Sequence, residues 1–144
     1  MRRTLVDTEC WLWWHLDPER LGPEAMALLE ERGSPLLLSA ASSWEIAIKV
    51  GLGKLELPVP PERFVPEQMA EDGIDPLPIE HAHALRVARL PPHHSDPFDR
   101  LLVAQAQLER CSLLTADAQL FGYDVDLVWG GRDRPPRPRP RRRT

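Results

Sequence analysis

A chain of 144 residues is long enough to bury one hydrophobic core and too short for two. Its 42% hydrophobic and 28% charged residues exclude an intrinsically disordered protein, and no apolar run approaches the roughly 20 residues of a membrane-spanning helix. The net charge of −4 is unevenly distributed, because residues 131–144 carry seven arginines against one acid, which leaves residues 1–130 at −10. An acid at Asp7 comes before any signal-peptide core can form, so we expect a cytoplasmic protein with no membrane partner.

Short apolar runs alternate with longer amphipathic segments along the chain, which is typical of an α/β fold with a parallel sheet. We expect four to five strands flanked by helices, because each strand is followed by a segment of helical periodicity. In chain order, the predicted elements are a strand at Thr4–Val6, helices at Glu9–Leu16 and Pro23–Arg32, a strand at Pro35–Leu38, helices at Ala41–Val50 and Pro61–Glu71, a strand at Asp75–Ile79, helices at Glu80–Arg89 and Pro97–Arg110, a strand at Ser112–Thr115, a short helix at Ala118–Phe121 and a strand at Asp126–Trp129.

Residues 131–144 consist mostly of Arg and Pro, and such a segment buries too little apolar surface to offset the entropy lost on ordering. We therefore divide the chain into a folded domain at 1–130 and a disordered tail at 131–144. A nucleic-acid-binding arm is the alternative interpretation of the tail, since arginines release counterions from phosphate backbones.

Acidic residues follow the inner strands of the predicted sheet. Asp7 comes directly after the first strand, Asp117 comes shortly after the fourth, and Glu45 lies on the helix that follows the second. Asp99 lies in the first turn of the clearest helix, Pro97–Arg110. Because the carboxyl ends of parallel strands meet at one edge of a sheet, we expect these acids to converge there.

Carboxylates gathered in this way repel one another unless a cation lies between them, and Mg²⁺ and Mn²⁺ prefer such hard oxygen ligands. We therefore predict a metal site in which Asp7, Asp99 and Asp117 hold the ion. Glu45 is assigned to position or deprotonate a water molecule that attacks a phosphodiester.

Each of these acids also has a purely structural interpretation. Asp96 at the N-cap, before Pro97, with Asp99 three residues on, matches a helix start, and Asp117 is placed to cap the helix after it. Ser42 and Glu45 have the spacing of a capping box. Caps explain acids near helix starts, but they do not explain an acid after every inner strand.

Other potential metal ligands favour no additional site. The histidines at 81, 83, 93 and 94 have no Cys or acid at a structural-zinc spacing, and we expect His93 and His94 to lie in a solvated, Pro-rich loop. Cys10 and Cys111 are far apart in the sequence, so we interpret them as small buried apolar side chains.

Four motifs stand out along residues 4–129. They are Leu5-Val6-Asp7-Thr8 followed by Leu12-Trp13-Trp14, then Ser39 to Lys49 with Gly53-Lys54-Leu55, then His93 to Ala106 containing Asp96-Pro97-Phe98-Asp99-Arg100, and finally Leu114-Thr115-Ala116-Asp117. These motifs resemble those of PIN-domain ribonucleases of the VapC type, the toxins of VapBC toxin–antitoxin pairs. They occur in the family's order and at its spacing, and one of them alone would be weak evidence.

The resemblance implies a PIN-like parallel sheet and a Mg²⁺- or Mn²⁺-dependent endoribonuclease that acts on RNA. Carried across residue by residue, it places Asp7, Glu45, Asp99 and Asp117 in the acidic cluster. Thr115 becomes the hydroxyl that orients the cluster, and Asp96 is mainly a helix cap. Glu9 departs from the family pattern, because relatives often carry His there.

The resemblance also implies a cognate antitoxin that covers the acids, and a homodimer. Of the tryptophans at 11, 13, 14 and 44, we expect most to pack in the core, and an interface is the alternative.

Two other functions compete with the ribonuclease. A phosphatase that forms an aspartyl-phosphate on Asp7 requires a general acid two residues on, a position that Glu9 fills only loosely. A catalytically silent PIN-like module that binds RNA or protein is typically marked by the loss of one or more of the acids. All four acids are present here.

Overall fold

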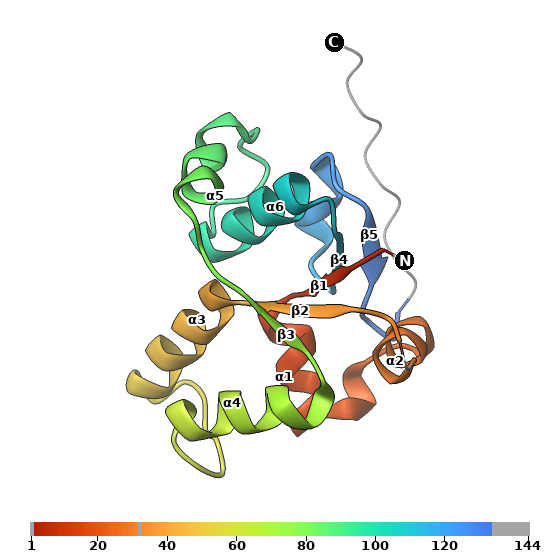
Figure 1. The fold of residues 1–144 in the computed structure, drawn as a ribbon, viewed down its shortest axis with the longest axis vertical. Coiled ribbons are helices and arrows are strands. Elements are labelled where there is room, and N and C mark those ends of the chain that lie inside the picture. Colours follow the sequence, from red (N-terminus) through yellow and green to blue (C-terminus); the bar gives the residue numbers. More distant parts are fainter. Residues whose placement is uncertain (1, 32, 134–144) are drawn as a thin grey trace.

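The structure is a computed structural model that describes residues 2–31 and 33–133. Within these residues, five parallel strands form one sheet with helices on both faces, which confirms the predicted fold class (Figure 1). The elements are β1 (Thr4–Val6), α1 (Thr8–Leu16), the 3₁₀ helix η1 (Pro18–Arg20), α2 (Pro23–Glu30), β2 (Leu36–Ser39), α3 (Ala40–Gly51), α4 (Pro61–Asp72), β3 (Asp75–Leu77), α5 (His81–Arg86), the 3₁₀ helix η2 (Val87–Arg89), α6 (Pro97–Glu109), β4 (Ser112–Thr115), the 3₁₀ helix η3 (Ala118–Gly122) and β5 (Leu127–Trp129).

Several elements are shorter than the sequence pattern predicts. The strand expected to reach Ile79 ends at Leu77, since the next residue, Pro78, has no N–H to donate to a neighbouring strand. The helix expected over Glu80–Arg89 divides into α5 and η2. In the described part of the chain, no helix is both long enough and apolar enough to cross a membrane.

The order of the strands, β3-β2-β1-β4-β5, places β1 at the centre of the sheet. Leu5 pairs with Leu37 of β2 on one side and with Leu113 of β4 on the other. Strands β2 and β3 are thus added in sequence on one side of β1, and β4 and β5 are then added on its other side. Such a reversal opens a crevice at the carboxyl ends of the two strands that flank it, here β1 and β4.

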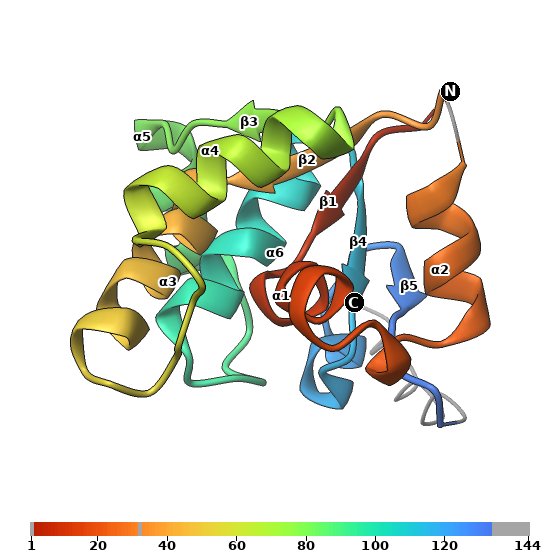
Figure 2. The same cartoon turned by 90° about the horizontal axis from the view of Figure 1, so that it is seen from below.

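The two faces of the sheet form separate cores because successive strand side chains point in opposite directions. Val6 and Leu114 face one core, which α1, α2 and α4 cover, while Leu5 and Leu113 face the other, which α6 covers (Figures 1 and 2). Trp11 is fully buried in the first core. The tryptophans at 13 and 14 pack against the same core, whereas the one at 44 is 59% exposed, so the prediction that most tryptophans pack the core is confirmed.

Cys10 and Cys111 are both buried free thiols, as expected. Cys10 lies in the first core, and Cys111 lies in the second. Burial raises the pKa of each thiol, because a thiolate is poorly solvated there. Both side chains therefore act as small apolar groups.

The segment after β5 packs back onto the start of α2. Gly22 donates its backbone N–H to the Gly130 carbonyl at 2.9 Å, and Leu21 forms an antiparallel bridge with Gly131. Arg132 donates to the Glu19 carbonyl. These contacts extend the folded body to about residue 133, and the rest of the predicted tail, 134–144, lies outside the described residues.

This packing predicts opposite effects for two Gly→Ala substitutions. A Cβ on Gly22 would lie 2.2 Å from the Gly131 carbonyl oxygen, so we expect Gly22→Ala to lower the free energy of unfolding by about 1–3 kcal/mol. Gly51, at the end of α3, has open space, and Gly51→Ala should be neutral or stabilise the protein by up to about 1 kcal/mol. Urea unfolding measures both values, and equal effects would contradict this packing.

Candidate active site

Asp7 lies directly after β1 and forms the N-cap of α1, where its carboxylate accepts the Cys10 backbone N–H at 2.8 Å. The residue is 5% exposed, and burial raises the pKa of its carboxyl group to about 6. A hydrogen bond from the Thr115 hydroxyl partly offsets this rise, and the negative charge of the exposed Glu9 adds to it. Asp7 is therefore both a helix cap and a carboxylate that burial keeps from ionising easily.

Asp99 lies in the first turn of α6, and Asp96 caps that helix by accepting the backbone N–H groups of Phe98 and Asp99 at 2.8 and 3.1 Å. The pKa of Asp99 is raised to about 7, and burial is the largest cause. The charges of Asp96, Asp7 and Glu45 contribute to this rise, and His94 opposes it. Asp99 is thus close enough to three other acids for their charges to raise its pKa.

Asp117 follows β4 and caps η3 by accepting the Gln119 backbone N–H at 2.9 Å. The Thr115 hydroxyl oxygen in turn accepts the Asp117 backbone N–H at 3.1 Å. Thr115 is fully buried and contacts both Asp7 and Asp117, which follow neighbouring strands. This position supports the orienting role assigned to it.

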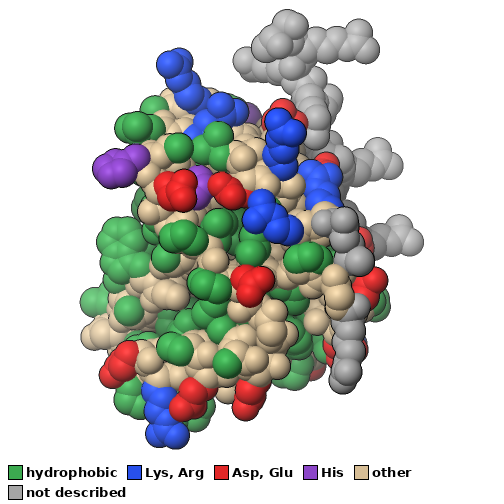
Figure 3. Space-filling view, in the orientation of Figure 1, with side chains coloured by type: hydrophobic (Ala, Val, Ile, Leu, Met, Phe, Trp, Pro, Cys, Tyr) green, Lys and Arg blue, Asp and Glu red, His purple; other side chains and the backbone are tan. Residues whose placement is uncertain are grey.

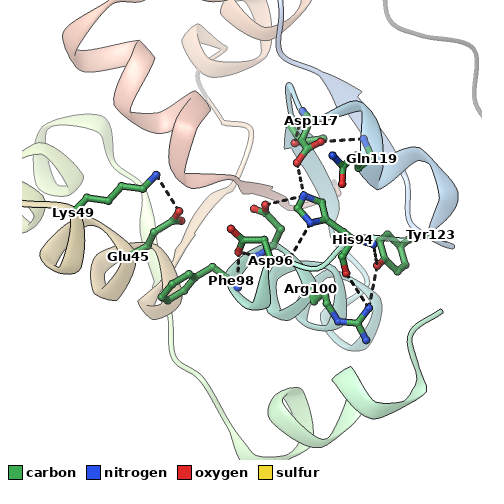
Figure 4. A network of polar contacts seen from close by, with 11 residues as sticks. Glu45, Lys49, His94, Asp96, Phe98, Arg100, Asp117, Gln119 and Tyr123 are labelled. Atoms are coloured by element: carbon green, nitrogen blue, oxygen red, sulfur yellow. Dashed lines mark hydrogen bonds and ion pairs between the residues drawn. The ribbon is translucent and has the colours of Figure 1, made fainter. Parts of the chain in front are cut away.

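Glu45 lies in the second turn of α3, and its side chain is 12% exposed. Its carboxylate forms an ion pair with Lys49 one turn later at 3.1 Å (Figure 4). The helix begins at Ala40 with Ser39 as its N-cap, so the capping box predicted from Ser42 and Glu45 is wrong. Glu45 therefore does not cap this helix.

His94 lies inside the acidic cluster, which sequence reasoning missed (Figure 4). Its Nε2 atom is 2.6 Å from Oδ2 of Asp117 and 3.3 Å from Oδ2 of Asp99, and its side chain is 10% exposed. The prediction of a solvated loop is wrong for His94, although His93 is exposed. The available signal was its position two residues before Asp96, the cap of the helix that carries Asp99.

A divalent cation fits the side chains gathered here. Within the described residues, His94, Asp99 and Asp117 offer donor atoms that all lie within 4.8 Å of one another. Carboxylate oxygens are the ligands that Mg²⁺ and Mn²⁺ prefer, and a cation relieves the repulsion that raises the pKa of Asp99. Of the predicted ligands, Asp99 and Asp117 belong to this group, whereas Asp7 lies outside it and is coupled to Asp99 through its charge.

The raised pKa of Asp99 predicts a pH-dependent gain in stability on removing its charge. In the unfolded chain Asp99 ionises near its ordinary pKa of 3.8, whereas in the folded protein it ionises only near pH 7. The charged Asp99 therefore lowers the free energy of unfolding, by an amount that grows from about pH 4 and is complete above about pH 7. In EDTA, the increase in Tm caused by Asp99→Asn should be about 3 °C or more larger at pH 8 than at pH 5.

Asp75→Asn, at an exposed carboxylate on the edge strand, is the matched control, and its effect on Tm should be the same at both pH values. Thermal unfolding followed by circular dichroism measures the difference. An equal effect of Asp99→Asn at the two pH values would contradict the cause assigned to the raised pKa.

Comparison with known proteins gives a consistent family assignment. The PIN domain family model matches residues 4–125. Ribonuclease VapC16 of Mycobacterium tuberculosis is 47% identical over 60 residues, which cover 42% of this chain and only 43% of that relative. Ribonuclease VapC22 of the same organism is 29% identical over 124 residues, covering 85% of this chain and 93% of VapC22.

Solved structures share the fold at lower sequence identity. VapBC2 from Rickettsia felis, bound to a DNA fragment from its promoter, matches with a TM-score of 0.66 at 12% identity, covering 89% of this chain and 98% of that one. FitAB bound to a DNA fragment matches with a TM-score of 0.57 at 20% identity, covering 87% and 93%. The match of the family model over most of the chain, together with the parallel sheet and the acids at its carboxyl edge, shows that this chain belongs to the PIN domain family.

Proposed function

We propose that the chain is a metal-dependent endoribonuclease, the toxin of a VapBC-type toxin–antitoxin pair. The observation that carries the proposal is the convergence of Asp7, Glu45, Asp99 and Asp117 at the carboxyl edge of β1 and β4. The relatives matched by sequence are named as ribonucleases, and they support RNA as the substrate. The cofactor is Mg²⁺ or Mn²⁺.

The acidic side chains divide the work of hydrolysis between them. Asp99 and Asp117 would hold the cation with Asp7 beside them, and the cation would supply Lewis-acid activation of the phosphate and of water. Glu45 accepts one proton of the attacking water as the new P–O bond forms, and the leaving ribose oxygen takes a proton from solvent as its bond to phosphorus breaks. Lys49 orients the Glu45 carboxylate through its 3.1 Å ion pair.

The proposed partner is an antitoxin protein, because the solved structures with this fold include toxin–antitoxin complexes. One side of α3 offers it an apolar surface, where hydrophobic side chains lie exposed (Figure 3). Trp44 is 59% exposed and Ile48 38%, and their spacing of four residues places them on one face of α3. Leu52, the C-cap residue of α3, follows at the same spacing and is 64% exposed. A homodimer is also part of the proposal.

The ribonuclease proposal predicts metal-dependent cleavage that depends on Asp99. Purified protein should cut a total bacterial RNA pool into discrete products with Mg²⁺ or Mn²⁺ and not with EDTA. Asp99→Asn should slow cleavage by about 100-fold or more, since it removes a ligand of the cation that stabilises the transition state. Gel electrophoresis of time courses gives the rates.

Asp75→Asn, which leaves the cluster intact, is the control and should cleave at the wild-type rate. Wild-type rates in Asp99→Asn would contradict the assignment of the site. A folded wild-type protein, free of any bound partner, that cuts no RNA with either metal would favour the silent binding module instead.

The proposed partner predicts that the chain is not recovered alone from its native cells. Affinity purification under native conditions should yield a second protein whose removal by denaturation and refolding restores RNA cleavage. The double variant Ile48→Glu/Leu52→Glu should release this protein, because it places two charges on the exposed face of α3. Leu85→Glu, at a residue that is 73% exposed on α5, is the control. Retention of the protein by the double variant would show that it binds elsewhere.

A further inference from the structure

The position of the proton on His94 follows from its surroundings. Its Nδ1 atom accepts the Asp96 backbone N–H at 2.9 Å, so Nδ1 carries a lone pair. With its lone pair engaged at Nδ1, the ring presents its N–H at Nε2. This N–H is the group that faces Asp117 at 2.6 Å and Asp99 at 3.3 Å (Figure 4).

The backbone that carries His94 is held in place from two sides. The His94 N–H donates to the Tyr123 hydroxyl at 2.9 Å, and the His94 carbonyl accepts from Arg100 at 3.3 Å. Arg100 also donates to the Tyr123 hydroxyl and to the carbonyls of Val87, Leu90 and Pro91. The Arg100 guanidinium therefore holds the loop that precedes α6 through several hydrogen bonds. Because the backbone of His94 is fixed in this way, its imidazole ring has a defined position.

Asp117 itself is held by two donors. Its Oδ1 accepts the Gln119 backbone N–H, and its Oδ2 accepts from His94. A carboxylate has about four lone-pair sites, so both oxygens can still bind a cation. Asp99 and Asp117 come from different elements, α6 and the turn after β4, and their charges repel. The Nε2–H of His94 donates to Asp117 at 2.6 Å and lies 3.3 Å from the Asp99 carboxylate, so it places a positive hydrogen-bond donor beside both charges.

We propose that His94 is a positioning residue that holds Asp99 and Asp117 at the separation a divalent cation requires, through its Nε2–H. This role rests on the proposed metal-dependent function. The free energy of cation binding includes the cost of ordering the ligands, and a donor that orders them beforehand lowers this cost. Asp96 then has two structural roles. Its carboxylate caps α6, and its backbone N–H donates to Nδ1 of His94 and so directs the ring N–H to Nε2.

Two other roles for the same ring predict different results. If His94 were itself a ligand, its nitrogen would bond directly to the cation. If instead the ring occupied the place of the cation, its removal would tighten cation binding. A positioning donor predicts weaker binding without it and no direct bond from nitrogen.

The test is Mn²⁺ binding to the full chain, measured by the EPR signal of free Mn²⁺ during titration. His94→Gln places an amide N–H near the position of Nε2, whereas His94→Asn, one methylene shorter, places it near Nδ1. We expect His94→Asn to raise the Kd for Mn²⁺ by about 10–100-fold and His94→Gln to stay within about threefold of wild type. His81→Asn, at an exposed histidine on α5, is the matched control and should not change the Kd.

Circular dichroism and Tm confirm that each variant is folded, and His94→Leu repeats the test if His94→Asn unfolds. A folded variant lacking the donor that binds Mn²⁺ as tightly as wild type, or more tightly, overturns the proposal. So does a pulsed-EPR coupling from a directly bound nitrogen that is present in wild type and lost in His94→Gln. Either result leaves the ribonuclease proposal standing, whereas a wild-type protein that binds no Mn²⁺ overturns both.

Discussion

The burial of several carboxylates close to one another at the carboxyl edge of β1 and β4 is the physical constraint on which the site depends. Burial and neighbouring negative charge raise the pKa of Asp99 to about 7, and burial raises that of Asp7 to about 6. An arrangement of this kind lowers the free energy of unfolding, and proteins retain it where function requires it.

Nearby hydrogen-bond donors reduce this cost without removing it. The Thr115 hydroxyl and the Cys10 backbone N–H donate to Asp7, and the Gln119 N–H donates to Asp117. Lys49 is the cation paired with Glu45, and the ring of His94 lies between two further acids. Secondary structure fixes the backbone donors and Thr115, and a hydrogen-bonded loop fixes His94, so Asp7 and Asp117 are oriented before any ligand binds.

A chain of buried polar side chains fixes the position of α6, which carries Asp99. Ser39, at the end of β2, donates to Gln105 of α6 at 2.5 Å. The Gln105 amide donates to the Pro78 carbonyl, and His83 of α5 lies 3.0 Å from Glu109 at the other end of α6. Buried polar groups of this kind cost free energy unless they are paired, and the pairs formed here favour the observed register of α6 against the sheet. The position of Asp99 thus depends on residues outside the site.

The sequence by itself determined the sheet, its helices and the acids at its edge. Apolar runs such as Thr4–Val6 have to be buried on both faces, and an acid such as Asp7 that directly follows a run can only lie at the sheet's edge. Capping also depends on local spacing, which is why the role of Asp96 was predicted correctly. Only the tertiary structure decided what His94 contacts, because its loop approaches Asp117 across 23 residues of sequence through a hydrogen bond to Tyr123 and the support of Arg100. The return of Gly131 to Leu21 was likewise decided by the tertiary structure, since close packing between distant backbone segments leaves no periodic pattern in the sequence.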